Sequence, residues 1–267
     1  MRLIDYIRSG ALMNEIKFLG TAGARHVVTR QLRSSGGIWY TLEGTQLLVD
    51  PGPGTLVKAL SSRPKLDPPG LNGILLSHRH IDHCSDVNIM IEAMTSGGTK
   101  VRGTLLAPND ALESDPVVFR YLRGHLEAID VIREGAEFPL GKITIGFPIR
   151  HRHSVETFGY RIRWNGGTVC HIVDTRFFPE LIDAYTGDLL ILNVVLHDPE
   201  NEKVAFIDHL NINDARRLIG EIKPSTAILT HFGMSMLRAK PWELAARLQE
   251  ETGVPVIAAR DGMAFTL

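Results

Sequence analysis

The densest group of metal-binding residue types in the sequence is the six-residue stretch HRHIDH, which follows the apolar run GILLS. Its histidines are His78, His80 and His83, and its carboxylate is Asp82. Because alternate residues of an extended strand point the same way, His78 and His80 can present two imidazoles to one ion. Asp82 and His83 add an oxygen and a third nitrogen, a donor set that suits zinc, manganese or iron. Surface histidines gathered by chance would explain one pair, but four ligating residues in six positions favour a metal site.

These residues lie where a strand is expected to give way to a helix. Val87, Met90, Ile91 and Met94 recur at helical spacing after the cluster, and Ser85 is available as the N-cap. Elsewhere in the first half, apolar runs bounded by turn residues predict strands at 15–20, 37–44, 45–50, 73–78 and 102–108, and we expect a helix within 116–132.

The second half of the chain repeats this style. Strands are expected at 142–151, 189–195, 226–232 and 254–260, and a hairpin at 158–174 that turns at Asn165 and Gly166. Helices are expected at 213–223, with Asn213 as N-cap, and at 241–253. Mixed sheets and helices in both halves predict an α/β protein in which two sheets pack face to face with helices outside. We interpret residues 1–267 as one domain, with 1–12 as a candidate N-terminal extension ahead of Met13.

Composition and charge restrict the class of protein. The chain has 267 residues, 44% hydrophobic and 22% charged, as in an ordinary globular protein. No apolar run approaches the roughly 18 to 20 residues that cross a bilayer, and the first residues lack the apolar core of a signal peptide. Cys84 and Cys170 are too few for a disulfide framework. We therefore expect a cytoplasmic protein, and its net charge of −1 argues against a broad surface for nucleic acid.

The stretch HRHIDH resembles the HxHxDH motif of the metallo-β-lactamase superfamily, where the motif also joins a strand to a helix. Three further residues follow in the order that this family shows, each at or just past an apolar strand: His153 in RHRHSVETFGY, Asp174 in HIVDTRFF and His231 in AILTHFG. The resemblance extends from FLGTAGARH to AARDGM, nearly the whole chain. It implies an αββα four-layer sandwich with the site at the edge between the two sheets.

The same resemblance implies two divalent metal ions, with zinc in first place and manganese or iron as alternatives. One ion would be held by three imidazoles, those of His78, His80 and His153. The other would be held by Asp82, His83 and His231, and Asp174 would bridge the two.

Within the superfamily, the sequence is most similar to the branch that contains ribonuclease Z and the cyclic phosphodiesterase of phosphonate breakdown. The opening FLGTAGARH…RSSGGIWYTLEGTQLLVDPGPG is similar to that branch, and so is the placement of His153 before Gly159. This spacing favours His153 over His151 as the ligand, and His151 stays a candidate for supporting a ligand or contacting substrate. Asp50 resembles the aspartate that holds a ligand histidine by its other ring nitrogen, and it also suits a turn before Pro51.

A further histidine separates types of reaction. His209, in DHLNINDA, resembles the branch's additional histidine, which protonates the leaving oxygen. In the mechanism that the resemblance implies, a hydroxide between the metals is the nucleophile. Asp82 is then a catalytic residue as well as a ligand. A histidine of near-neutral pKa donates the proton that the leaving alkoxide needs. Asp208 is a candidate for orienting His209. A solvated loop histidine is the plainer alternative for His209.

We therefore expect a dinuclear metal-dependent phosphodiesterase. The hairpin expected between His153 and Asp174 leaves no room for the long arm with which ribonuclease Z grips transfer RNA. The expected substrate is compact: a cyclic nucleotide, a cyclic sugar phosphate or a short oligonucleotide end. A homodimer is a candidate assembly, because dimers are common in this branch.

Two other functions remain open. A thioester or lactone hydrolase would use the same metal pair and would not need His209. A metal-holding scaffold or nucleic-acid-binding protein without turnover is disfavoured, since the ligand set is complete.

Other polar residues carry a weaker interpretation. Cys84 follows a ligand but has no role left in a histidine-rich site, so packing at the helix start is expected. Four cations are candidates for binding a phosphate: Arg30, Arg33, Arg238 and Lys240. Isolated cations are more often solvated, which is the plainer interpretation of each. Histidines for which a structural role is expected are His26, His125, His171 and His197.

Overall fold

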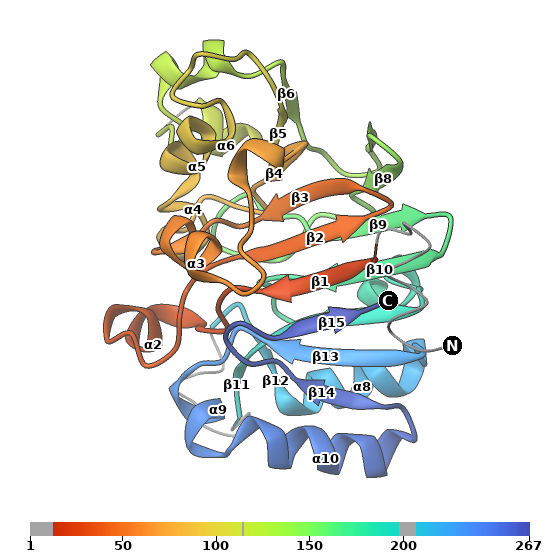
Figure 1. Cartoon of the computed structure of the whole chain (residues 1–267). Coiled ribbons are helices and arrows are strands. Elements are labelled where there is room, and N and C mark those ends of the chain that lie inside the picture. The colour runs from red at the N-terminus through yellow and green to blue at the C-terminus, as the bar shows by residue number, and fades with distance from the viewer. Residues whose placement is uncertain (1–12, 114, 198–206) are drawn as a thin grey trace, which may run out of the picture.

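Two β-sheets form the centre of the protein. The computed structural model describes residues 13–267 apart from residue 114 and residues 198–206, so the candidate extension at 1–12 lies outside the described residues. The first sheet has the strand order β15-β1-β2-β3-β4-β5-β6 (Figure 1). Its strands are β1 (Glu15–Phe18), β2 (Ile38–Leu42), β3 (Thr45–Val49), β4 (Gly73–Leu75), β5 (Thr104–Ala107), β6 (Ala128–Val131) and β15 (Ala264–Thr266). Strands β3 to β6 are parallel, whereas β15, β1, β2 and β3 pair antiparallel.

The second sheet has the order β14-β13-β11-β10-β9-β8-β7, with β12 paired to β11. Its strands are β7 (Glu137–Leu140), β8 (Ile143–Gly146), β9 (Tyr160–Trp164), β10 (Gly167–Ile172), β11 (Leu189–Leu196), β12 (Leu210–Asn211), β13 (Thr226–Thr230) and β14 (Val256–Ala258). The expected hairpin is present as β9 and β10. Strands β10, β11, β13 and β14 are parallel, so their C-terminal ends meet at one edge of the sheet.

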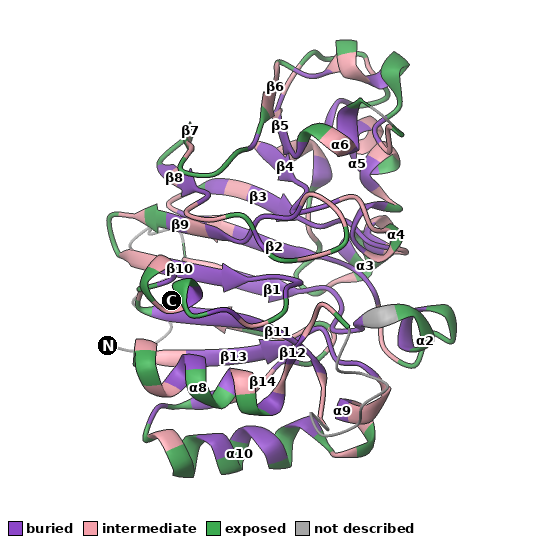
Figure 2. Cartoon of the chain, turned by 180° about the vertical axis from the view of Figure 1, so that it is seen from behind, coloured by how far each residue is buried: buried purple, intermediate pink, exposed green. Residues whose placement is uncertain are grey.

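Most of the buried apolar side chains divide into three layers, and a small separate cluster of Ala22, Val27 and Val28 packs against α9 (Met234–Arg238). One layer lies between the sheets and includes Phe18 and Ile191. On the outer face of the first sheet, Leu105 packs with residues of α5 (Val87–Met94). On the outer face of the second, Leu190 packs with residues of α8 (Ile212–Ile222) and α10 (Pro241–Thr252). This arrangement is the αββα sandwich, which confirms the expected fold class, and Figure 2 shows the buried strands beneath half-exposed helices.

The remaining helices are short and lie mostly in the connections between strands. They are α2 (Ala24–Thr29), α3 (Thr55–Ser61), α4 (Ile81–Cys84), α6 (Asn109–Leu112), α7 (Glu180–Ala184), α9 (Met234–Arg238) and the 3₁₀ segments η1 (Pro68–Gly70) and η2 (Arg120–His125). In the described part of the chain, every helix is too short or too polar to span a bilayer.

The structure differs from the expected elements around the cluster. Two helices replace the single one expected there, because α4 ends after one turn and α5 starts after Asp86. Ser85 is therefore not the N-cap of α5, and its hydroxyl instead donates to the Ile81 carbonyl within the first helix. The helix expected within 116–132 is also wrong. That segment forms η2 and then the edge strand β6, whose Ala-Ile-Asp-Val sequence pairs with β5.

The start of α8 also lies earlier than expected. Asn211 is its N-cap and accepts from the backbone N–H groups of Asn213 and Asp214. The Asp214 carboxylate accepts in return from the Asn211 N–H, which completes a capping box. This box fixes the chain directly after His209.

Candidate metal centre

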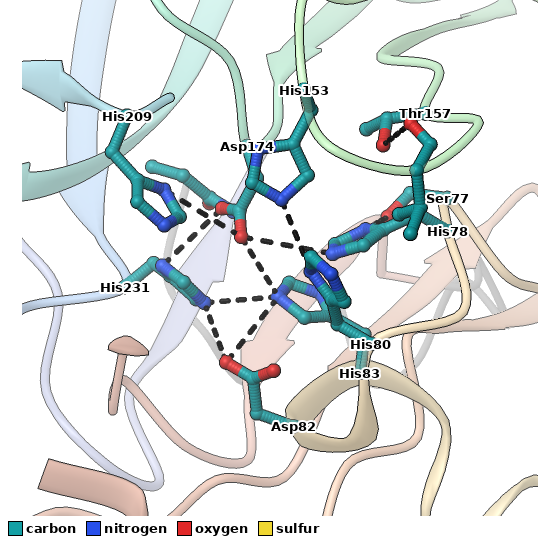
Figure 3. A network of polar contacts seen from close by, with 12 residues as sticks. Ser77, His78, His80, Asp82, His83, His153, Thr157, Asp174, His209 and His231 are labelled. Atoms are coloured by element: carbon teal, nitrogen blue, oxygen red, sulfur yellow. Dashed lines mark hydrogen bonds and ion pairs between the residues drawn. The ribbon is translucent and has the colours of Figure 1, made fainter. Parts of the chain in front are cut away.

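The residues of HRHIDH occupy the connection between β4 and α4. Strand β4 ends at Leu75, His78 follows in the loop, and His80 is the N-cap residue of α4. Asp82 and His83 belong to the single turn of that helix. The sharp change from strand to helix brings all four side chains to one side of the chain, as Figure 3 shows.

The second sheet supplies the other candidates from its strand ends. Asp174 lies two residues beyond β10, and His231 directly follows β13. His231 has a φ of 59°, a left-handed backbone that is uncommon outside glycine and concentrates at functional sites. Gly23 packs against this turn so closely that an added Cβ would lie 2.1 Å from the His231 carbonyl oxygen.

One group of ligand atoms consists of His78, His80 and His153, with all three atoms within 4.8 Å of one another. Nε2 of His153 lies 3.0 Å from Nδ1 of His80. Nε2 of His78 is buried and has no hydrogen-bond partner among the described residues. Converging imidazole nitrogens with an unpaired buried member fit a divalent cation, and three imidazoles are a known zinc-binding set.

A second group consists of Asp82, His83 and His231. Nε2 of His83 lies 3.0 Å from Nε2 of His231, and Asp82 Oδ2 lies 3.5 Å from the latter atom. Two ring nitrogens that face each other this closely share either one proton or a cation. The adjacent carboxylate favours the cation, so this donor set also fits a divalent metal.

Asp174 lies between the two groups and is 2% exposed. Its Oδ2 is 3.7 Å from His78 Nε2 of the first group and 3.4 Å from His83 Nε2 of the second. Its Oδ1 is 3.4 Å from His231 Nδ1. A single carboxylate thus faces both groups, as a bridging ligand must. The structure therefore brings together all seven residues expected to bind metal.

The charges of the centre favour bound cations. Burial raises the pKa of the Asp174 carboxyl, but the surrounding imidazoles of His231, His209 and His83 outweigh burial and hold that pKa well below its usual range. Burial lowers the pKa of His78 and of His80, which keeps both neutral and able to ligate. For His83, burial is outweighed by neighbouring carboxylates, which raise its pKa well above the ordinary value. The same carboxylates attract a metal ion to this position.

The outer nitrogens of the histidines are held by neighbouring groups. Nδ1 of His83 lies 2.9 Å from Asp50 Oδ2, and the Asp50 Oδ1 accepts from the Ser77 N–H at 2.7 Å. Ser77 Oγ donates to Asp50 Oδ2 at 2.6 Å and lies 2.9 Å from Nδ1 of His78. Nδ1 of His153 lies 2.9 Å from the Asp208 carbonyl oxygen. Such contacts fix which nitrogen faces a metal.

His209 lies at the edge of the centre, with Nδ1 3.7 Å from Asp174 Oδ2. Burial lowers its pKa to about 4, below the near-neutral value expected for a proton donor. Asp208 differs from its expected role as well. Its carboxylate lies 2.6 Å from Arg176 Nη2, and its backbone carbonyl contacts His153 rather than His209.

His151 lies in the interior, 3% exposed. Its Nε2 is 2.8 Å from Tyr185 Oη, and burial lowers its pKa to about 3. The ring is therefore neutral and packed in the protein, which leaves little surface for a substrate. Cys84 is buried as expected, but it is the last residue of α4 and does not lie at a helix start. Burial raises the pKa of its thiol to about 11.

The four candidate phosphate-gripping cations lie on segments that are close to one another, since Val28 packs with Leu237 and one pocket is lined by both Arg33 and Pro241. Arg30 and Arg238 are exposed, and Arg33 is half-buried. Lys240 Nζ lies 2.8 Å from Glu243 Oε1, so its charge is already paired.

Two residues with roles in the centre were not expected. Ser77 links Asp50 to His78, and Asn193 donates from Nδ2 to Asp174 Oδ1 at 2.9 Å. Asn193 carries a signal in the sequence, because it is the one polar residue of the strand LLILNVVL, and a buried amide needs a partner. Ser77 has no comparable signal beside its histidine neighbour.

Comparisons with known proteins agree with this geometry. A model of the beta-lactamase superfamily domain matches residues 45–232. Uncharacterized protein MJ1374 of Methanocaldococcus jannaschii is 33% identical over 260 residues, which cover 95% of each chain. Ribonuclease Z of Kineococcus radiotolerans is 29% identical over 172 residues, which are 57% of this chain and 48% of that enzyme.

Among solved structures, the metallo-beta-lactamase fold protein YhfI from Bacillus subtilis superposes with a TM-score of 0.78 at 20% identity, covering 96% of this chain and 100% of that one. This likeness concerns the fold. Together with the family model and the sequence relatives, it shows that the chain belongs to the metallo-β-lactamase superfamily of hydrolases, near the ribonuclease Z branch.

Proposed function

We propose that this protein is a metal-dependent phosphodiesterase that hydrolyses a small or cyclic phosphodiester or the end of an oligonucleotide. The observation that carries the proposal is the position of His209, whose ring lies beside Asp174 at the edge of the ligand set. The sequence similarity to ribonuclease Z of Kineococcus radiotolerans supports the same reaction class.

In this proposal each of the two ligand groups would hold a divalent cation, and Asp174 would be within reach of both. Bound cations supply an activated water and offset the negative charge on a phosphoryl oxygen. Asp50, Ser77 and the Asp208 carbonyl keep the ring nitrogens of the ligands directed inwards. We also propose that the described chain acts as a single domain, since both groups draw on both sheets.

His209 is proposed to give a proton to the leaving oxygen. Its lowered pKa means that the ring is neutral at pH 7 before substrate binds. A phosphodiester carries a negative charge, and a negative charge beside an imidazole favours its protonated form. Substrate binding and proton uptake by His209 are therefore coupled in this proposal.

The proposed substrate is compact. The segment between His153 and Asp174 is taken up by a short loop and the β9–β10 hairpin. Three arginines next to the ligands are paired with carboxylates: Arg79 with Asp110, Arg152 with Glu180 and Arg176 with Asp208. Paired cations offer little attraction to an extended polyanion.

A thioester or lactone hydrolase is the second candidate, and the pKa of His209 favours it. Acyl transfer on the same metal pair has less need of a protonated histidine for the leaving group. The test is to assay protein loaded with zinc or manganese against bis-p-nitrophenyl phosphate, cyclic nucleotides, short oligonucleotides, thioesters and lactones.

The His209→Ala variant distinguishes the two candidates. For a phosphodiesterase, we expect kcat on diesters to fall about 10²- to 10⁴-fold, the usual contribution of a general acid. The exposed His26 provides the matched control, and His26→Ala should leave the rate unchanged. Unchanged diester turnover in His209→Ala contradicts the proposed proton transfer, and activity on thioesters or lactones alone supports the second candidate.

A further inference from the structure

A continuous line of buried polar side chains runs from Asp174 into the space between the two sheets. Asn193 Nδ2 donates to Asp174 Oδ1 at 2.9 Å, and its Oδ1 lies 2.8 Å from His171 Nε2. His171 Nδ1 lies 2.8 Å from Tyr160 Oη, and that oxygen lies 2.9 Å from Tyr40 Oη. Each of the five residues is at most 3% exposed. We refer to Tyr40, Tyr160, His171 and Asn193 as the interior chain.

The interior chain crosses a layer that is otherwise almost wholly apolar. Its members come from β2, β9, β10 and β11, so it joins both sheets. Burying polar groups costs free energy unless each finds a partner, and here the partners form an unbroken series. A layer that only had to hold the sheets together would need none of them. The series ends at Asp174, the carboxylate that lies between the two ligand groups.

The chemistry of the end group determines the direction of every bond. An ionised carboxylate only accepts, so the amide nitrogen of Asn193 must face Asp174 and the amide oxygen must face His171. That oxygen requires a proton on Nε2 of His171. Burial lowers the pKa of His171 to about 4, so the ring is neutral and Nδ1 is an acceptor. Tyr160 therefore donates to His171, and Tyr40 donates to Tyr160.

All four bonds then point the same way, towards Asp174. Hydrogen bonds aligned in series polarise one another, which strengthens the last donor. That donor occupies Oδ1 of Asp174 from the interior side. This bond restrains the carboxylate with Oδ2 directed at His78 and His83, 3.7 and 3.4 Å away.

We propose that the interior chain positions Asp174 as the bridging ligand, with Asn193 as the direct positioning residue and His171 as the residue that orients Asn193. This inference rests on the proposed function only in that Asp174 contacts both cations. Removing a member should weaken cation binding, and the effect should decline from Asn193 through His171 and Tyr160 to Tyr40. A purely structural role in packing the sheets gives no such order.

The test is titration of metal-free protein with Co²⁺, which reports affinity by calorimetry and ligand geometry by its visible absorption. We expect Asn193→Leu to weaken binding of at least one ion about 10- to 100-fold, as for other groups that hold metal ligands, and to change the spectrum. His171→Phe should have a smaller effect, and Tyr40→Phe less than about threefold. His171→Gln keeps an amide donor and acceptor and should recover part of the affinity lost in His171→Phe.

Asn88→Leu is the matched control. Asn88 also uses both amide groups, donating to the Val117 carbonyl and accepting from the Phe119 N–H, but it lies outside the interior chain. The Asn88→Leu variant should have a lower unfolding free energy than wild type when both are measured in chelator, and it should bind Co²⁺ with the affinity of wild type. The inference is overturned if Asn193→Leu binds Co²⁺ like wild type, or if affinity losses follow the unfolding free energies of the metal-free variants instead of the order of the chain. Should Asn193→Leu not fold, the comparison of His171→Phe, Tyr160→Phe and Tyr40→Phe decides by the same order.

The outcome is separate from that of the proposed function. If wild type binds two ions and the graded losses occur, the interior chain positions Asp174 whatever the substrate is. If diesters are not hydrolysed, only the proposed reaction fails.

Discussion

At the scale of single residues, the centre depends on groups that set the direction of each ligand. Asp50 is the clearest case, because one carboxylate contacts His83 and receives both the backbone and the hydroxyl of Ser77. It does so from a left-handed backbone with φ of 50°. Asparagine and aspartate tolerate that conformation better than most residues, which allows a conservative substitution.

We expect Asp50→Asn to weaken zinc or manganese binding about 10- to 100-fold with little change in fold, because the neutral amide holds Nδ1 of His83 less strongly. Calorimetric titration of metal-free protein measures the change. The exposed Asp67, changed to asparagine, is the control. Equal affinities for the two variants would show that Asp50 does not support the ligand.

His171 gives a pH dependence whose sign follows from its pKa. Its folded pKa is about 4, while the unfolded value is about 6.5. Between these values the unfolded chain binds more protons, so this residue destabilises the fold as the pH falls through that window. Between pH 7 and pH 5, wild type should lose on the order of 1–2 kcal/mol more unfolding free energy than His171→Phe.

Denaturant unfolding in chelator, at both pH values, measures this difference. The comparison between proteins cancels the contributions of the other histidines, including His83, whose raised pKa acts in the opposite direction. A parallel decline in the two proteins would mean that folding does not lower the pKa of His171.

At the scale of elements, the ligands depend on short connections at strand ends. The loop at Gly23 packs directly on the turn at His231, and an isolated bridge joins Ala22 to Phe232. The N-terminal segment therefore supports a ligand from the far end of the sequence. Any side chain at Gly23 must displace one of the two loops.

We expect Gly23→Ala to cost about 1–3 kcal/mol of unfolding free energy, as overpacking usually does, and to weaken metal binding as well. Gly124→Ala is the control, since a Cβ there meets no described atom within 4 Å. Its unfolding free energy should stay within about 0.5 kcal/mol of wild type. If both variants have the stability of wild type, close packing of Gly23 on the turn at His231 does not contribute to the free energy of unfolding.

At the scale of the whole molecule, both ligand groups join the two sheets. The first group combines His78 and His80, which follow β4, with His153, which follows β8. The second combines Asp82 and His83 with His231, which follows β13. A cation held by either group would therefore connect layers that otherwise meet mainly through apolar packing.

Metal removal should therefore lower the thermal midpoint. A bound ion would add about 2.7 kcal/mol at a free concentration 100 times its dissociation constant. Thermal unfolding with and without a chelator measures the shift. In Asp174→Ala the shift should be much smaller, and an equal midpoint with and without chelator in wild type would argue against tight metal binding.

The fold class and the clustering of the first four candidate ligands could be predicted from the sequence because their signals are local. Apolar runs mark the strands. The stretch HRHIDH contains four of the candidate ligands within six residues. The failures have physical reasons too. No local signal shows that α4 ends after one turn. No local signal shows either that part of the segment 116–132 is more stable as an edge strand than as a helix. The burial of His209, and hence its low pKa, depends on how separate loops meet.

The interior chain lies beyond local prediction for the same reason. Tyr40, Tyr160, His171 and Asn193 meet only because the register of four strands and the packing of the two sheets align them. The sequence predicts a structural role for His171 and no role for Asn193. The polar residue in an apolar strand is the one local hint.

The order of the candidate ligands along the chain also has a consequence for biosynthesis. A ribosome adds roughly 5–20 residues per second, so His153 emerges seconds before His231. The group of three imidazoles can then be complete while the group with Asp82 still lacks its last member, and β15, which pairs with β1, is made later still. A nascent chain in a cell rich in metal would be expected to capture its ions one after the other.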